Sequence, residues 1–479
     1  MLVVDQSYFD QARIVASILG IKLTSKLFGK GPSRVREPFC GFPLSHLVKH
    51  VSTIVEAGHK VVIVEEFKEA GTSDGNIKRK VSRVVTPGTG VDETFVEMEK
   101  MNFVLALGVV DGGEGKEIGM AYRDISTGAS FTRTSTLSSL RDNIQLVRPK
   151  EVVINERLEA TLIGEQILTL LRGEQQRESL MVSAVSTDAI PSSSTSAPSS
   201  QSAAEEVLLA YLASTLVDLP PPRTRATFVD PTQVMQLDAV TLKSLEIRES
   251  LRGGVKGSLL YGVKRTVTPG GTRLLSERLC ESPLTSSRPY NQSDSCILLA
   301  AAPLTNLDEI HSRLALVSAF HTNLSPSRSF LRALLRTLDD TPRLLQRLHL
   351  RRGTAFDLLG LKNTMRALQT IRQDSDDRLP QTGASDSILA EYGLTREEVD
   401  AVRKLVSRLG NFDQLANEIE IAIDEEALMA QTRAQERKAM VAEEFGDRAK
   451  EREDEEELAV RTESDGLWGE DKFWVIRDE

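Results

Sequence analysis

The stretch from 237 to 284 constrains the fold more than any other, because it specifies two helices and the joint between them. Its first half repeats at helical spacing on one face and is closed by Gly253-Gly254. The residues on that face are Leu237, Val240, Ser244, Ile247 and Leu251. Its second half begins a new helix at Thr268, a predicted N-cap, followed by Pro269, whose missing N–H is harmless there. Three leucines are predicted to face inward from this second helix: Leu274, Leu275 and Leu279.

The length and composition predict an intracellular multidomain protein. At 479 residues the chain has room for roughly three domains of about 150 residues each. No apolar run reaches the roughly 18 residues that a membrane span needs, so we expect no membrane partner. The first residues resemble neither a signal peptide nor a transit peptide. The three cysteines are widely spaced and odd in number, which predicts reduced thiols.

The negative charge of the chain is concentrated near its end. The net charge is −10, but the residues 436–479 contain sixteen Asp or Glu and eight Lys or Arg. That segment therefore carries −8 and leaves only about −2 for everything before it. An acidic total of this kind does not exclude basic surfaces that bind nucleic acid elsewhere.

The hydrophobic patterns divide the chain into three parts. Residues 1–98 read as a mixed α/β domain, with helices at 9–19 and 45–56, strands at 21–24 and 60–67, and an alternating strand after residue 78. Residues 102–216 read as a second α/β unit with four strands. Within it, the Ser-, Pro- and Ala-rich stretch 183–202 is predicted to be a disordered surface loop. Residues 225–479 read as almost entirely helical, except for a predicted final strand at 472–477.

Several motifs resemble the MutS family of DNA mismatch-repair proteins. The core of that family has an Asp-Ala-x-Thr-x-x-x-Leu-Glu-Ile helix before Thr-x-Thr-Pro-x-Gly-x-Arg-x-Leu, and this chain has both, at 238–247 and 266–275. The N-terminal part is similar to the family's mismatch-binding domain through Gly-Phe-Pro at 41–43, Glu-Glu-Phe at 65–67 and the run at 79–89. The Gly-Phe-Pro and Glu-Glu-Phe variants are most similar to the fungal mitochondrial branch. A mitochondrial location follows from that resemblance, with the nucleus as the alternative.

The resemblance implies a multidomain α+β fold. Residues 1–98 would be a mixed α/β mismatch-binding domain that is incomplete at its N-terminus, and 102–216 a ribonuclease-H-like α/β connector. Residues 225–479 would be an all-α core with long lever helices that stops at the first strand of the clamp. We expect a truncated homologue without the family's ATPase domain, because no Gly-x-x-x-x-Gly-Lys-Ser/Thr loop is present. No cofactor and no catalytic activity are expected of this chain, whereas full-length members use ATP and magnesium.

The resemblance also implies a DNA-binding face. The family wedges the Phe of a Phe-x-Glu motif against the mispaired base, and alignment places Val4 and Gln6 at those two positions. Val4 can press on a base but cannot stack, and Gln6 can still hydrogen-bond. Lys26, Ser45 and His46 match positions that approach the DNA backbone, where donors contact phosphate without reading sequence. A phosphate patch is predicted on the basic strand, with ordinary solvated charges as the alternative: Lys78, Arg79, Lys80 and Arg83.

The expected partners are mismatched double-stranded DNA and, in a longer form, a second MutS-family subunit. Two other functions stay open. One is an interaction module that binds repair partners but no DNA. The other is a metal-dependent nuclease, in which Asp111 and Asp124 on consecutive strands would hold magnesium. His46 and His50 lie at helical spacing and could share a metal, but no third ligand is evident, so we expect no metal site.

Overall fold

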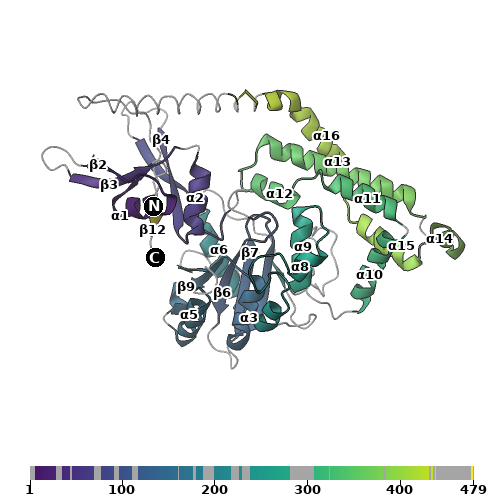
Figure 1. The fold of residues 1–479 in the computed structure, drawn as a ribbon, viewed down its shortest axis with the longest axis horizontal. Helices are drawn as coiled ribbons and strands as arrows, with labels where there is room; N and C mark the ends of the chain where they lie inside the picture. The colour runs from purple at the N-terminus through teal and green to yellow at the C-terminus, as the bar shows by residue number, and fades with distance from the viewer. Residues whose placement is uncertain are drawn as a thin grey trace.

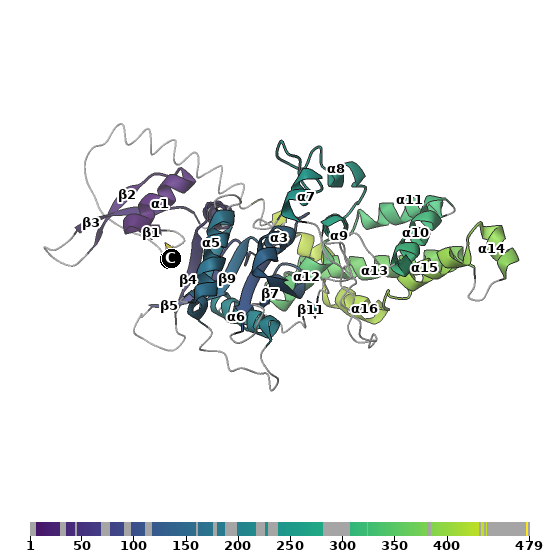
Figure 2. The same cartoon turned by 90° about the horizontal axis from the view of Figure 1, so that it is seen from below.

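A computed structural model describes the chain over the residues 6–28, 35–43, 46–68, 77–90, 97–110, 117–159, 161–175, 180–186, 199–216, 226–228, 238–280, 307–322, 324–380, 385–430, 433–434, 437 and 476–477. Within them, an N-terminal unit of strands and two helices lies at one end of the molecule. A unit built on a six-stranded sheet lies in the middle, and a group of helices extends to the other end (Figures 1 and 2). The mixed α and β content agrees with the predicted multidomain α+β class.

The N-terminal unit packs two helices against short antiparallel strands. Its elements are β1 (Gln6–Tyr8), α1 (Phe9–Leu19), β2 (Thr24–Phe28), β3 (Val35–Gly41), α2 (Leu47–Glu56), β4 (Lys60–Lys68) and β5 (Ile77–Val85). One sheet has the order β1-β3-β2, and β4 pairs with β5 in the other. Both sheets share one apolar core with α1 and α2, in which Val15, Ile54 and Val61 are completely buried.

Two details of this unit differ from the sequence prediction. The strand predicted at 21–24 begins only at Thr24, so most of the predicted residues precede it. The alternation expected along β5 is interrupted, because Ile63 pairs with Arg83 while Val64 pairs with Val81. Ser82 is therefore the extra residue of a β-bulge, and the residues on its two sides do not keep a simple two-residue repeat.

The middle unit is a mixed sheet covered on both faces. Its elements are β6 (Phe103–Val109), β7 (Glu117–Asp124), β8 (Ser130–Thr136), α3 (Leu137–Val147), β9 (Glu151–Asn155), α4 (Glu156–Glu159), α5 (Leu162–Gln175), β10 (Met181–Val185) and α6 (Ser200–Thr215). The strand order is β10-β9-β6-β7-β8-β11, in which the edge strand β11 is Thr227–Phe228. Strands β6, β7 and β8 are antiparallel, and β9 and β10 are parallel to β6. Alternate residues of β6 enter the two cores: Leu105 packs with α3 and α5, and Ala106 packs with α6.

Helix α6 lies directly on the sheet because two glycines leave room for its backbone. Gly108 on β6 and Gly119 on β7 are cross-strand partners. A Cβ at Gly108 would lie 2.2 Å from the amide nitrogen of Ala204, and one at Gly119 would lie 1.8 Å from the carbonyl oxygen of Ser200. No side chain can occupy either position without displacing the helix.

The loop predicted at 183–202 is wrong at both ends. Ser183 lies inside β10 and is buried. Its hydroxyl donates to the carboxylate of Glu151, so the buried polar group is satisfied. Ser199 caps α6, which already includes residue 200, and its hydroxyl accepts a hydrogen bond from the backbone N–H of Ser202. A high serine content predicts a loop, but it does not show which serines form specific hydrogen bonds in a strand or at a helix cap. Residues 187–198 of the predicted loop lie outside the described residues.

The remaining described residues are mostly helical. The helices are α7 (Ala239–Ser244), α8 (Leu259–Val263), α9 (Pro269–Cys280), α10 (Leu307–His321), α11 (Ser325–Leu335), α12 (Thr341–His349), α13 (Ala355–Arg378), α14 (Asp386–Tyr392), α15 (Arg396–Val406) and α16 (Asp413–Ala422). The longest is α13, which starts with a capping box between Thr354 and Asp357. None of the described helices combines the length and apolar content needed to cross a membrane.

The helix pair predicted from 237 to 284 is only half present. Helix α9 begins at Pro269 as predicted, and the Thr268 hydroxyl accepts from the N–H of Gly271 at 3.1 Å. The first helix, however, is the six-residue α7, which ends before Glu246, a non-glycine residue with a φ of 49°. The residues predicted to share one face of that helix do not form a buried face, because Val240 is 73% exposed and Leu251 is 64% exposed. Helical spacing alone did not detect the irregular backbone that follows.

Two short strands lie in the region from 225 onward, one in the part predicted to be helical and one at the predicted final strand. β11 (Thr227–Phe228) adds a parallel edge to the middle sheet beside β8. β12 (Ile476–Arg477) falls within the predicted final strand, but it pairs antiparallel with β4 of the N-terminal unit. The region 225–479 is therefore not purely α-helical. Backbone pairing with distant strands is a tertiary effect that local patterns do not reveal.

Candidate nucleic-acid interface

The strand β5 contributes the largest described group of predicted DNA-binding residues. Arg79 and Lys80 are exposed, Arg83 is half-buried, and the side chain of Lys78 lies outside the described residues. The register places Lys80 opposite Glu65 and Arg79 opposite Glu66 of β4. The strands β4 and β5 together contain six Lys or Arg and two Glu, and the residues that connect them add Glu69 and Asp74, so the hairpin over 60–85 is positive by two charges. A hairpin of this charge can attract a phosphate backbone.

Gln6 and Lys26 lie on the other sheet, on opposite sides of β3. Gln6 is the first residue of β1 and pairs with Gly41, and Lys26 of β2 pairs with Glu37. The Lys26 ammonium group lies 5.3 Å from the centre of the Phe39 ring, within the range of a cation–π contact. The side chain remains exposed, so its ammonium group is accessible to an anion.

His46 precedes α2, and its ring contacts the ring of His50, one helical turn further along the chain. Its ring centroid lies 5.7 Å from that of His50, which lies 4.5 Å from that of Phe42. Partial burial lowers the pKa of His50, and the neighbouring His46 and Lys49 lower it further. Protonation of His50 is therefore less favourable than that of an ordinary histidine. The two rings form a packing contact at the exposed start of the helix.

The predicted site residues are thus brought to one unit but not to one strand. Val4 and Ser45 lie outside the described residues. The others occupy two sheets and the start of α2, which are joined by the core that α1 and α2 share. The first sheet carries Gln6 and Lys26. The second carries the basic residues of β5.

Asp124, predicted as a possible metal ligand, has a structural role. The side chain is completely buried. One carboxylate oxygen accepts from the N–H and the hydroxyl of Ser126 at 2.8 and 2.7 Å, and the other accepts from the N–H of Asn102 at 3.2 Å. These donors shape the turn after β7, and a cation would have to replace them. Asp111 lies outside the described residues, which contain no group of three or more His, Cys, Asp or Glu side chains placed to hold a metal ion.

Sequence reasoning missed four buried charged residues that connect the parts of the molecule. Glu151 lies at the start of β9, Arg273 lies in α9, and Asp340 and Arg343 lie at the start of α12. All four side chains are almost fully inaccessible. The sequence marks Arg273 only as one position of the motif at 266–275. The spacing predicted Leu274, Leu275 and Leu279 as the inward residues of α9, but these three are only half-buried. Arg273 is buried instead, and the spacing does not predict this.

Comparison with known proteins gives the chain a family. A family profile described as MutS domain I matches residues 6–94, and one described as MutS domain III matches residues 299–465. The first match coincides with the unit that carries the predicted DNA-binding residues. The second covers the helices α10 to α16.

Curated relatives align with most of the chain. The DNA mismatch repair protein MutS of Nitrobacter hamburgensis is 29% identical over 418 residues, which are 83% of this chain and 43% of that protein. The MutS of Rickettsia bellii is 27% identical over 88% of this chain and 45% of its own length. The MutS of Ruegeria pomeroyi is 30% identical over 76% of this chain and 40% of its own length. The chain spans less than half the length of these relatives, and it belongs to the MutS family of DNA mismatch-repair proteins.

Proposed function

We propose that this chain binds double-stranded DNA in mismatch repair, with the unit over 6–90 as its DNA-contacting part. The match of residues 6–94 to MutS domain I carries the proposal, because that unit also holds the positive β4–β5 hairpin. In this proposal the six-stranded unit is the ribonuclease-H-like connector, and the helices from α7 onward are the core and levers. ATP, magnesium and a second MutS-family subunit would act with a longer form.

In the proposed mechanism, one set of residues attracts the DNA backbone and another set contacts the mispaired base. Lys26 and the four cations of β5 (Lys78, Arg79, Lys80 and Arg83) would neutralise backbone phosphates and release their counterions, so binding would weaken steeply as salt is added. Val4 and Gln6 would lie at the base pair. Because Val4 has no aromatic face, it would not stack on a mispaired base, and affinity would depend little on sequence or mismatch.

Neutralising the four cations of β5 is expected to remove most duplex binding. The variant replaces Lys78, Arg79, Lys80 and Arg83 by Gln. Each phosphate contact adds roughly 0.9 to the slope of log affinity against log salt, so losing all four should reduce that slope by about 3 to 4. Fluorescence anisotropy with a labelled duplex at several salt concentrations measures the slope directly.

A matched control removes the same charge elsewhere. Four exposed cations of the α7–α8 region would be replaced by Gln in a second variant: Lys243, Arg252, Lys256 and Arg265. The slope of log affinity against log salt for this variant should differ from that of the unmodified chain by no more than about 0.9, the contribution of one phosphate contact. Equal losses in the two variants would show that binding is not localised to β5 and would contradict the proposed interface.

A further inference from the structure

The segment from 86 to 100 links the N-terminal unit to the middle sheet, and its two described parts, 86–90 and 97–100, are each held by buried charged side chains. Its first residue, Thr86, directly follows β5, and its hydroxyl donates to the Glu151 carboxylate at 2.6 Å. Glu151 is 0% exposed. Gly88 lies against the same residue, since a Cβ there would come within 2.4 Å of Val104 and 3.0 Å of Glu151. The segment thus enters the core of the middle unit as soon as β5 ends.

Glu151 forms this first anchor with hydroxyl groups from three directions. Besides Thr86, the hydroxyls of Ser183 on β10 and Tyr211 on α6 each donate to it at 2.5 Å. Burial raises the pKa of Tyr211 well above its ordinary value, and the charge of Glu151 raises it further, so Tyr211 remains a donor. A buried carboxylate with three donors holds its neighbours in one arrangement, because any departure leaves a buried polar group unpaired.

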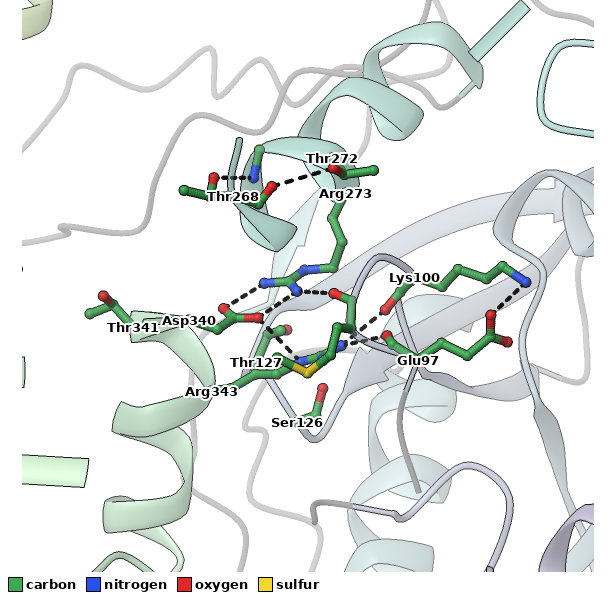
Figure 3. A network of polar contacts seen from close by, with 12 residues as sticks. Glu97, Lys100, Ser126, Thr127, Thr268, Thr272, Arg273, Asp340, Thr341 and Arg343 are labelled. Atoms are coloured by element: carbon green, nitrogen blue, oxygen red, sulfur yellow. Dashed lines mark hydrogen bonds and ion pairs between the residues drawn. The ribbon is translucent and has the colours of Figure 1, made fainter. Parts of the chain in front are cut away.

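The second anchor holds the other end of the segment with two guanidinium groups (Figure 3). Arg273 donates to the carbonyl oxygen of Met98 at 2.7 Å, and Arg343 donates to those of Glu97 and Lys100 at 3.1 and 3.0 Å. Asp340 binds Arg273 through both carboxylate oxygens, at 2.6 and 2.7 Å, and lies 3.7 Å from Arg343. The three side chains are 3–5% exposed. Backbone carbonyls from the segment thus help to satisfy buried cations of α9 and α12.

We propose that Glu151 and Arg343 are positioning residues that set the orientation of the N-terminal unit relative to the rest of the molecule. The two anchors join the segment to the middle sheet at one end and to the helical core at the other. The unit is then presented to DNA in a defined orientation, not on a free tether. The DNA part of this statement rests on the proposed function, whereas the fixed orientation does not.

Distances between spin labels test the orientation without DNA. Exposed residues supply label positions on three bodies: Glu56→Cys on α2, Glu156→Cys on α4 and Arg336→Cys after α11. Cys280 and Cys296 would be replaced by Ser, and the buried Cys40 would be kept. Pulsed electron resonance should give narrow distributions for both pairs that include Glu56→Cys. In Glu151→Gln both distributions should broaden at least about twofold, because the contact with the middle sheet has lost its acceptor. In Arg343→Met the distribution between Glu56→Cys and Arg336→Cys should broaden by a similar amount, because the contact with the helical core has lost its donors.

Three controls separate orientation from folding. The pair between α4 and α11 should stay narrow in Glu151→Gln, because α4 and α11 lie outside the N-terminal unit. Arg343→Lys, which keeps a donor, should restore part of the narrow distribution. Lys264→Gln removes a solvent-accessible ion pair to Glu99 of the same segment and should change nothing, since exposed pairs contribute little.

The outcomes distinguish this inference from the proposed function. A broad distribution in the unmodified chain, or unchanged distributions in both anchor variants, would overturn the inference. Narrow distributions that broaden in both variants support it, even in a chain that does not bind duplex DNA. Failure of the unmodified chain to bind duplex would overturn the proposed function instead. If both hold, Arg343→Met should also weaken duplex binding about threefold or more while Lys264→Gln does not.

Discussion

Replacing Asp340 by asparagine is expected to lower the free energy of unfolding by about 3–5 kcal/mol, one of the two largest effects of any single change we foresee. Asparagine fits the same space but carries no charge. Two buried guanidinium groups, from Arg273 and Arg343, would then lack their common anion. The desolvation of both cations is already complete in the folded protein, so the lost attraction is not replaced by water. Urea unfolding followed by circular dichroism measures the loss.

The neighbouring residue supplies the control for this change. Asp339 precedes Asp340 and is exposed. Asp339→Asn should therefore change the free energy of unfolding by no more than about 0.5 kcal/mol. If Asp340→Asn were as mild as Asp339→Asn, the three buried charges would not form the junction that their geometry indicates.

Replacing Gly119 by alanine is expected to destabilise the middle unit by about 3 kcal/mol or more. The added methyl group would lie 1.8 Å from the carbonyl oxygen and 2.1 Å from the carbonyl carbon of Ser200. Both atoms belong to the backbone of α6, so relief requires the whole helix to move away from β7. Overpacking a core usually costs about 1–3 kcal/mol, and a collision with backbone lies at the upper end or beyond. The midpoint of thermal unfolding should fall accordingly.

A second glycine tests whether the packing or the residue type causes the loss. Gly173 lies inside α5, and an added Cβ would have no atom within 4 Å. Alanine is a better helix former than glycine by about 1 kcal/mol, so Gly173→Ala should stabilise the protein by up to that amount. Opposite signs for the two Gly→Ala changes are the expected result. A loss of the same size at both positions would contradict the packing of α6 described above.

The elements that the sequence predicted best are those in which local pattern and tertiary contacts agree. Strand β4 is a run of β-branched residues, and its inward positions enter the core of the N-terminal unit. Helix α9 begins at Pro269 because Thr268 caps it and proline fits the first turn. In both cases one short stretch contains all the information that its structure requires.

The elements that were missed depend on contacts between distant residues. β10 contains Ser183, which is held in the sheet by pairing with β9 and by Glu151. Helix α7 stops where Glu246 takes a left-handed conformation, although the apolar spacing continues past it. β12 falls within the strand predicted at 472–477, but its pairing with β4, more than four hundred residues away in the sequence, was not predicted. No local rule predicts such pairings.

The family was predictable from motifs, whereas the arrangement of the charged residues was not. The positions quoted for the MutS resemblance led to the family that the two domain matches support. The candidate interface follows from the same resemblance, and the structure places its described members on two sheets and at the start of α2 in one unit. Glu151 and Arg343 carry no sequence signal of their roles, because their partners are hydroxyl and carbonyl groups from separate parts of the chain.

The most direct test of the central proposal measures the binding of the unmodified chain to two labelled duplexes, one matched and one with a central G·T pair. We expect both to bind with affinities within about twofold of each other. Both affinities should fall about a hundredfold between roughly 50 and 200 mM salt if four phosphates are contacted.

The same measurement on a variant with Val4→Phe and Gln6→Glu restores the family's wedge and carboxylate. That variant should prefer the G·T duplex by at least about tenfold, since base recognition is typically worth about 1–3 kcal/mol. A clear mismatch preference in the unmodified chain would show that the alignment of its first ten residues is wrong. Absence of binding to either duplex at the lowest salt would contradict the central proposal and favour an interaction module that binds no DNA.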